Sequence, residues 1–213
     1  MKECMADSAH DKEHVYRVLY TALDIAKTEE NADLDILITA CLLHDIGRRE
    51  QNENPVLCHA VIGAKKAGAF LEKQNYPADF VNAVCHCIET HRFRSDNPPK
   101  SIEAKILFDA DKIDVTGTLG IARTLLYNGR EGEPLYSLNG KGYVSDGKDD
   151  TEPSFFQEYR YKLENVYSRF LTGRGAEIAL SRQNSAVSFY ENMLKEVSSS
   201  YTKGKDVLTE YLK

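Results

Sequence analysis

The chain has 213 residues, 42% of them hydrophobic, and a formal net charge of −6 at pH 7. This length is enough for one well-buried domain with a helical extension. The acidic balance argues against a nucleic acid polymer held by a general basic field, but it leaves room for a local basic pocket that binds a small anion.

The cysteines form an odd set scattered over predicted helices, which is unlike a disulfide framework and indicates a reducing compartment. No apolar run approaches the roughly 20 residues of a membrane span, and the first residues lack the apolar region of a signal peptide. We therefore expect a cytoplasmic protein without a membrane partner. The cysteines are Cys4, Cys41, Cys58, Cys85 and Cys87.

Helical periodicity dominates the first half of the chain. Apolar residues recur at spacings of three and four from Val15 to Ala26. The nearly continuous apolar segment from Asp33 to Asp45 is long enough to favour a central bundle helix over a buried strand. Further helices are expected from Pro55 to Leu71, from Tyr76 to His91, and from Ser101 to Asp114.

The composition changes after this half. Gly, Asn, Ser, Asp and Lys prevail at about 128–153, which predicts a long surface loop of the kind that often acts as a lid. Helices return from Ser154 to Glu196 with an interruption around Gly173 to Gly175, and Tyr201 to Lys213 is expected to fray. The predicted fold class is all-α, as one domain over residues 1–213 with a core at about 10–125 and C-terminal helices at about 154–213.

Side chains that bind metals occur at the ends and along the faces of these helices. His44 and Asp45 follow the apolar segment directly, before Gly47, which we expect to end that helix. Burying an imidazole beside a carboxylate is costly unless a partner compensates, and a divalent cation suits both groups. The other candidates are His14, His59, His86, His91, Asp109, Asp111 and Asp114.

Four short strings resemble the HD-domain superfamily of metal-dependent phosphohydrolases, in particular its small bacterial stand-alone members. The family pattern is a histidine on an early helix, a His-Asp doublet ending a later helix, and an aspartate well downstream. The resemblance implies an all-helical HD-domain bundle with a C-terminal helical extension. The strings are His14-Val15-Tyr16-Arg17-Val18, Leu42-Leu43-His44-Asp45-Ile46-Gly47, His59-Ala60-Val61-Ile62-Gly63-Ala64 and Asp109-Ala110-Asp111-Lys112-Ile113-Asp114.

The resemblance also implies a central divalent metal ion. Asp111 is preferred over Asp109 because the late motif of the family has an alanine, the ligand aspartate and then a basic or bulky residue. Nitrogen and oxygen ligands without thiolate suit Mn, Mg, Fe, Co, Ni or Zn. The expected ligands are His14, His44, Asp45 and Asp111.

Such a metal would activate a water and polarise a phosphorus centre, and nearby cations would hold the phosphate oxygens. His59 and His91 lie where relatives place phosphate-binding or second-metal histidines. His86, five residues before His91, can hardly share its helix face. The predicted catalytic residues are Asp45, His59, His91 and Lys112, and the predicted substrate-binding residues are Arg17, Arg48, His59, His91 and Lys112.

The implied function is hydrolysis of a small phosphorylated molecule, with a nucleotide favoured. Two alternatives stay open: an HD-fold di-iron oxygenase, which uses the same ligand types, and a non-catalytic nucleotide sensor. Arg48 and Arg49 replace the acidic pair of guanosine polyphosphate hydrolases, and the Gly-Tyr-Pro string of cyclic-dinucleotide phosphodiesterases is missing after His91. The sequence is compatible with a homodimer and does not determine the oligomeric state.

Overall fold

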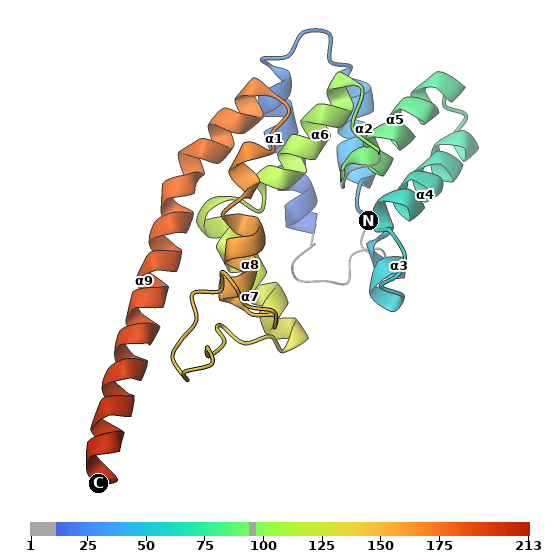
Figure 1. The fold of residues 1–213 in the computed structure, drawn as a ribbon. Helices are drawn as coiled ribbons and strands as arrows, with labels where there is room; N and C mark the ends of the chain where they lie inside the picture. The colour runs from blue at the N-terminus through green and yellow to red at the C-terminus, as the bar shows by residue number, and fades with distance from the viewer. Residues whose placement is uncertain (1–11, 94–96) are drawn as a thin grey trace. The chain divides into compact units, whose positions relative to one another are not determined.

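The computed structural model describes residues 12–93 and 97–213, so Cys4 and His10 lie outside the described residues. Within the described ranges the secondary structure is helical apart from one isolated bridge between Leu138 and Val144, which confirms the predicted all-α class (Figure 1). The chain divides into two compact units. Unit 1 holds the residues up to 114 together with 170–178, and unit 2 holds 115–169 and 179–213. One domain over the full length stays a prediction.

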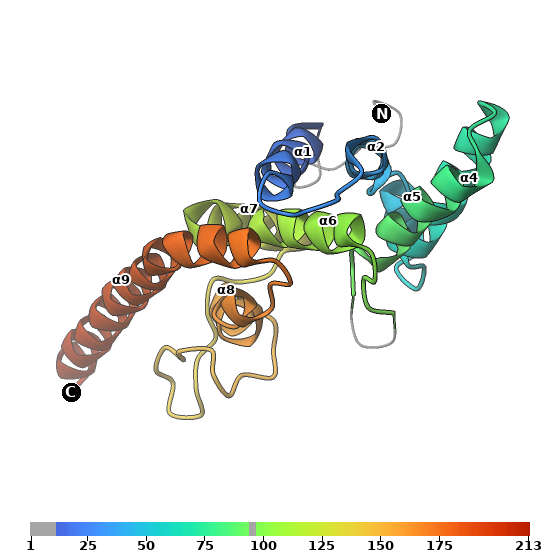
Figure 2. The ribbon, with the colours of Figure 1, turned by 90° about the horizontal axis from the view of Figure 1, so that it is seen from above.

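Unit 1 is a helical bundle, and polar side chains cap the first turns of two of its helices. The Asp33 carboxylate accepts hydrogen bonds from the N–H groups of Asp35 and Ile36, and the Ser101 hydroxyl accepts one from that of Ala104. Helices α4 and α5 run side by side (Figures 1 and 2). The helices are α1 Lys12–Ala26, α2 Leu34–Leu43, α3 Arg48–Glu53, α4 His59–Lys73, α5 Ala78–Thr90 and α6 Ile102–Ile113.

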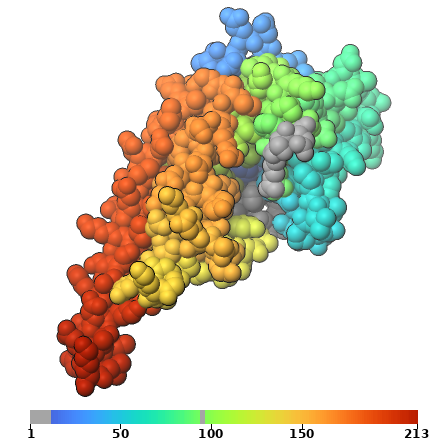
Figure 3. Space-filling model, viewed as in Figure 1, coloured from blue at the N-terminus to red at the C-terminus, as the bar shows by residue number. Residues whose placement is uncertain are grey.

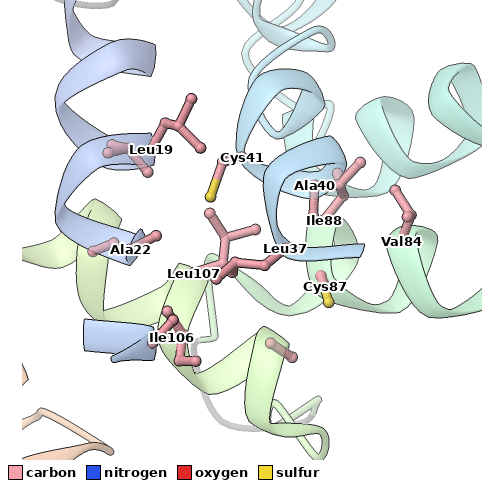
Figure 4. Close-up of a cluster of buried hydrophobic side chains, with 14 of the residues drawn as sticks. Leu19, Ala22, Leu37, Ala40, Cys41, Val84, Cys87, Ile88, Ile106 and Leu107 are labelled. Carbon is pink, nitrogen blue, oxygen red and sulfur yellow. The ribbon is translucent and has the colours of Figure 1, made fainter. Parts of the chain in front are cut away.

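The core of unit 1 lies between α1, α2, α5 and α6, with α4 packed against α5 (Figure 4). Helix α2 contacts the other three, as expected of a central bundle helix. Fully burying a leucine or isoleucine side chain contributes about 1.5–3 kcal/mol, so this cluster is the main source of stability for the unit. Its side chains include Leu19, Ala22, Leu37, Cys41, Val84, Ile88, Ile106 and Leu107.

Gly47 brings two backbones close together. A Cβ atom on Gly47 would lie 2.3 Å from the carbonyl oxygen of His59 and 2.7 Å from the nitrogen of Gly63. Helix α2 already ends at Leu43, so Gly47 does not terminate it as expected. The missing side chain instead lets the turn that carries His44 and Asp45 press against the start of α4.

Unit 1 has one short helix that was not predicted and one predicted helix start that is wrong. The polar residues Arg48–Glu53 form the short helix α3, and α4 begins at His59 instead of Pro55. The reason is a turn at Asn54, whose side chain accepts a hydrogen bond from Val56 N at 3.2 Å and whose carbonyl accepts one from Leu57 N at 3.0 Å. His59 is therefore the first residue of its helix.

Unit 2 also departs from the expected boundaries. Helix α7 continues through Asn128 and ends at Gly132, whose φ of 75° favours a residue without a side chain. The irregular segment therefore begins after α7. The elements are α7 Gly117–Glu131, α8 Phe155–Glu158, the π-helical turn η1 Tyr159–Leu163, the 3-10 turn η2 Val166–Ser168 and α9 Gly173–Tyr211, of which unit 2 contains the part from Ala179 onward.

Helix α9 begins where an interruption was expected and continues through the segment expected to fray. The Thr172 hydroxyl accepts a hydrogen bond from Gly175 N at 3.1 Å, so the two glycines occupy the first turn of one helix. The last turns, red in Figure 3, carry exposed apolar side chains at 207, 208, 211 and 212. None of the described helices is long and apolar enough to cross a membrane.

Candidate metal centre

Six potential ligands of unit 1 come from helix ends. His14 lies in the first turn of α1, His59 is the first residue of α4, and His91 directly follows α5. All are buried except Asp111, whose side chain is 26% exposed. When several helices end near one point, each can place a ligand side chain there without any bend in its backbone. The remaining three are His44 and Asp45, in the turn after α2, and Asp111, in the last turn of α6.

The first cluster contains the four expected ligands. His14 Nε2 lies 3.4 Å from His44 Nε2, 3.6 Å from Asp45 Oδ2 and 3.3 Å from Asp111 Oδ1. His44 Nε2 lies 3.6 Å from the same Asp45 oxygen and 4.0 Å from the same Asp111 oxygen. These separations suit four donor atoms around one ion at about 2.0–2.2 Å from each.

The second cluster shares Asp45 with the first. Its other carboxylate oxygen, Oδ1, lies 3.5 Å from His59 Nε2 and 3.8 Å from His91 Nε2. The two histidine nitrogens are 3.2 Å apart. His14, His44 and Asp45 of the first cluster have the proximity that a bound cation requires, and so do Asp45, His59 and His91 of the second.

Each of these histidines is oriented through its other ring nitrogen. The Nδ1–H group of His44 donates to the carbonyl oxygen of Cys41 at 2.8 Å, and that of His91 donates to the carbonyl oxygen of Ile88 at 2.5 Å. The remaining two histidines also meet oxygens, since His14 Nδ1 is 2.7 Å from Asp114 Oδ2 and His59 Nδ1 is 2.7 Å from Gln51 Oε1. Neutral rings held in this way direct the Nε2 lone pairs into the site.

The donor set fits a divalent cation. Asp45 Oδ2 is buried and has no hydrogen-bond partner among the described residues. A buried carboxylate oxygen is costly without a partner. Imidazole nitrogens and carboxylate oxygens without thiolate suit Mn, Fe, Co, Ni and Zn, and the carboxylates also suit Mg. A cation at this point would satisfy Asp45 and the converging lone pairs together.

The pKa values of the side chains in the first cluster also show that this site favours positive charge. Burial alone would lower the pKa of His14, but hydrogen bonds to Asp111, Asp114 and Asp45 outweigh it and raise the pKa to about 10. The pKa values of the Asp45 and Asp111 carboxylates are held well below their usual range by the neighbouring histidines, against the effect of burial. In the metal-free site, a proton on His14 therefore lies where a metal cation would lie.

The second cluster behaves differently. Burial lowers the pKa of His59 to about 2, assisted by the positive charges of Arg48 and His91. Burial likewise lowers the pKa of His91 to about 4. Both rings are therefore neutral at pH 7, and their Nε2 atoms are electron-pair donors.

The three predicted phosphate-binding cations have partners within unit 1. Arg48 Nε donates to Asp45 Oδ1 at 2.9 Å. Arg17 pairs with Asp114, and the Lys112 ammonium lies 4.3 Å from the centre of the Phe108 ring. Their role toward phosphate stays a prediction.

Asp109 faces away from the clusters. Its carboxylate accepts hydrogen bonds from Leu171 N at 2.9 Å and from the nitrogen and hydroxyl of Thr172, both at 2.7 Å. It thereby anchors the chain that leads into α9. His86 is also apart, since its Nε2 accepts a hydrogen bond from Lys100 N at 3.2 Å.

Two contacts of the site were not predicted from the sequence. Gln51 orients His59, and Asp114 pairs with His14 and Arg17. Gln51 lies three residues after Arg48, and their side chains meet at 3.4 Å. Its only signal in the sequence would have been its position one helical turn after Arg48, which requires knowing that α3 is a helix.

Residues 12–116 match the family described as HD domain. The fold, the match and the cluster geometry together define residues 12–116 as an HD domain, as the motifs predicted.

Similar proteins support this placement over most of the chain. The uncharacterized protein YpgQ of Bacillus subtilis is 29% identical over 194 residues, which cover 89% of this chain and 85% of YpgQ. A crystal structure of YpgQ in complex with ADP has a TM-score of 0.68 at 27% identity and covers 89% of this chain and 91% of that one. An HD-superfamily hydrolase from Bacillus thuringiensis has a TM-score of 0.66 at 27% identity, with coverages of 91% and 89%.

Proposed function

We propose that the protein is a metal-dependent phosphohydrolase that acts on a small phosphorylated substrate, most readily a nucleotide. The observation that carries this proposal is the buried first cluster, with its unpartnered Asp45 oxygen, inside an HD domain. The substrate class is supported by the ADP found in the similar protein YpgQ. We place the activity in the cytoplasm because the described cysteines are free thiols.

In this proposal His14, His44, Asp45 and Asp111 hold a divalent ion. A bound ion of this kind lowers the pKa of a water molecule and polarises a phosphoryl group. The protein contributes the geometry: Nδ1 hydrogen bonds fix the histidine rings before any ligand arrives. Such preorganisation avoids the cost of ordering the ligands at the moment of binding.

The second cluster is proposed to receive the phosphoryl oxygens. The lowered pKa values of His59 and His91 make both rings neutral at pH 7, but the negative charge of a phosphate raises their affinity for protons. Protonated at Nε2, they can donate hydrogen bonds to phosphoryl oxygens. Arg48 and Lys112 are near enough along the chain to add positive charge, and Arg48 also fixes Asp45 through Oδ1.

The experiment is a reconstitution assay. Metal is removed with a chelator, each divalent ion is restored in turn, and phosphate or pyrophosphate release is measured with nucleoside mono-, di- and triphosphates. We expect turnover with at least one ion, and we expect the double variant His44→Ala, Asp45→Ala to lose both metal and turnover. His86→Ala, outside both clusters, serves as the control. Absence of turnover with every ion and nucleotide would contradict the proposal.

A di-iron oxygenase is the second candidate because Asp45, His59 and His91 form a second set of suitable ligand atoms beside the first. Two irons per chain and uptake of oxygen would favour this function over hydrolysis. Tight nucleotide binding without turnover or oxygen uptake would instead indicate a sensor.

A further inference from the structure

The imidazole of His14 is held from both sides by α6. Its Nε2 lies 3.3 Å from Asp111 Oδ1, and its Nδ1 lies 2.7 Å from Asp114 Oδ2. The two aspartates are three residues apart, so they share one helix face. One ring therefore contacts a proposed metal ligand and, on its far edge, a carboxylate outside the ligand set.

Asp114 is in turn held by Arg17. Arg17 Nε donates to Asp114 Oδ1 at 2.8 Å, and Arg17 Nη2 donates to Asp114 Oδ2 at 3.0 Å. Two parallel bonds from a guanidinium fix the plane of a carboxylate as well as its distance. The Asp114 side chain is 4% exposed, so water can hardly replace these bonds.

The four residues close a ring between two helices. His14 and Arg17 are one turn apart on α1, and Asp111 and Asp114 are one turn apart at the end of α6. Among the described histidines of the two clusters, His14 is the one whose Nδ1 meets a carboxylate, whereas the others meet carbonyl or amide oxygens. A carboxylate acceptor fixes the tautomer more strongly and makes Nε2 a stronger electron-pair donor.

We propose that Asp114 is a positioning residue for the metal centre and that Arg17 acts through it. Asp114 keeps the proton of His14 on Nδ1 and directs Nε2 toward the other ligands, while Arg17 balances the buried charge and fixes the carboxylate. The inference rests on the proposed metal centre. It gives Arg17 a different role from the phosphate binding expected from the sequence.

The test is titration calorimetry of the metal-free protein with Mn²⁺, without nucleotide. We expect Asp114→Ala to weaken Mn²⁺ binding by about 10- to 100-fold, the range typical of residues that orient metal ligands. Asp114→Asn keeps an oxygen acceptor but loses the charge, so its loss should be smaller. Arg17→Ala should also weaken binding, because Asp114 then lacks its clamp.

Asp24→Asn is the matched control. Asp24 also lies on α1 and pairs with an arginine, since Arg174 Nε and Nη2 donate to it at 3.1 and 2.9 Å. This pair is three helical turns from His14, so its loss should leave Mn²⁺ affinity unchanged. Urea unfolding of each metal-free variant measures any purely structural effect separately.

Wild-type Mn²⁺ affinity in both Asp114 variants would overturn the positioning role, whatever their stability. If Asp114→Ala does not fold, the near-isosteric Asp114→Asn decides. Unchanged Mn²⁺ affinity in Arg17→Ala would overturn the part assigned to Arg17. Because no nucleotide is added in the calorimetry, a protein that binds Mn²⁺ but hydrolyses nothing would refute the proposed function and leave this inference standing.

Discussion

His59 and His91 bring their Nε2 atoms within 3.2 Å of each other, with Asp45 Oδ1 close to both. The Nδ1 atom of each ring already meets an acceptor, so in neutral rings two lone pairs face one another. Such an arrangement is unfavourable unless a proton, a hydrogen-bond donor or a cation lies between them. This pair should therefore be the part of the site most sensitive to what binds there.

Replacing His91 by alanine is expected to lower turnover by about 100-fold or more, the usual scale for losing a hydrogen-bond donor to the charge that develops in the transition state. The first cluster does not include His91, so at least one metal ion per chain should remain. Metal analysis and steady-state kinetics measure the two effects. His86→Ala, five residues earlier in the chain and outside both clusters, is the control, and equal turnover in the two variants would contradict the assignment.

Asp109 and Asp111 should respond in opposite ways to substitution. Asp109→Ala leaves the part-buried N–H group of Leu171 and the buried N–H group of Thr172 without their acceptor, at a cost of about 1–3 kcal/mol for the buried group, but should keep the metal. Asp111→Ala should lose the metal because a ligand is missing. Urea unfolding and metal analysis distinguish them. Loss of metal from the Asp109 variant alone would reverse our choice of ligand.

Gly175→Ala should destabilise unit 1. The added Cβ atom would lie 2.5 Å from Asp109 Oδ2 and 2.7 Å from Thr172 Oγ1, so the buried network must shift. Overpacking of this kind typically costs about 1–3 kcal/mol. Gly204→Ala in the same helix meets no atom within 4 Å and should stabilise by about 0.5–1 kcal/mol, as alanine does in helices. Urea midpoints of both variants against wild type measure the difference, and a shared sign would be inconsistent with the packing described.

The stability of the metal-free protein should peak near pH 6.5. The pKa of His14 is raised to about 10, so the folded state binds an extra proton whose stabilising effect is lost as pH rises from about 6.5 toward that value. The pKa values of His59 and His91 are lowered to about 2 and about 4, so the folded state loses stability as pH falls below about 6.5.

Urea midpoints measured in chelator between pH 5 and 9 test this dependence. His14→Gln should remove the loss on the alkaline side and keep the loss on the acid side. A wild-type midpoint that does not change between pH 7 and 9 would show that His14 is not held protonated by its aspartates.

Much of unit 1 could be predicted because its helices carry their own local signals. The apolar spacing from Val15 to Ala26 and the caps at Asp33 and Ser101 are features of single segments, and the structure has helices there. The short helix α3 has no apolar face and could not be recognised in this way. It is a short polar helix that follows the His44-Asp45 doublet, and its Gln51 side chain contacts His59.

The contacts that distinguish similar side chains depend on residues far away in the chain. Asp109 and Asp111 are two residues apart in one helix. The hydrogen-bond partners of Asp109 lie 62 and 63 residues later in the chain. The partner of Arg17 lies 97 residues later. No periodicity or spacing within a helix could reveal these pairs, so the choice between the aspartates rested on resemblance alone.

Asp45 presents one oxygen to each cluster, Oδ2 to the first and Oδ1 to the second. A carboxylate shares its negative charge between both oxygens, so a cation drawing on one leaves the other a weaker base. Occupancy of the two clusters is then described by linked equilibria. Any factor by which binding at the first changes affinity at the second must apply equally in reverse.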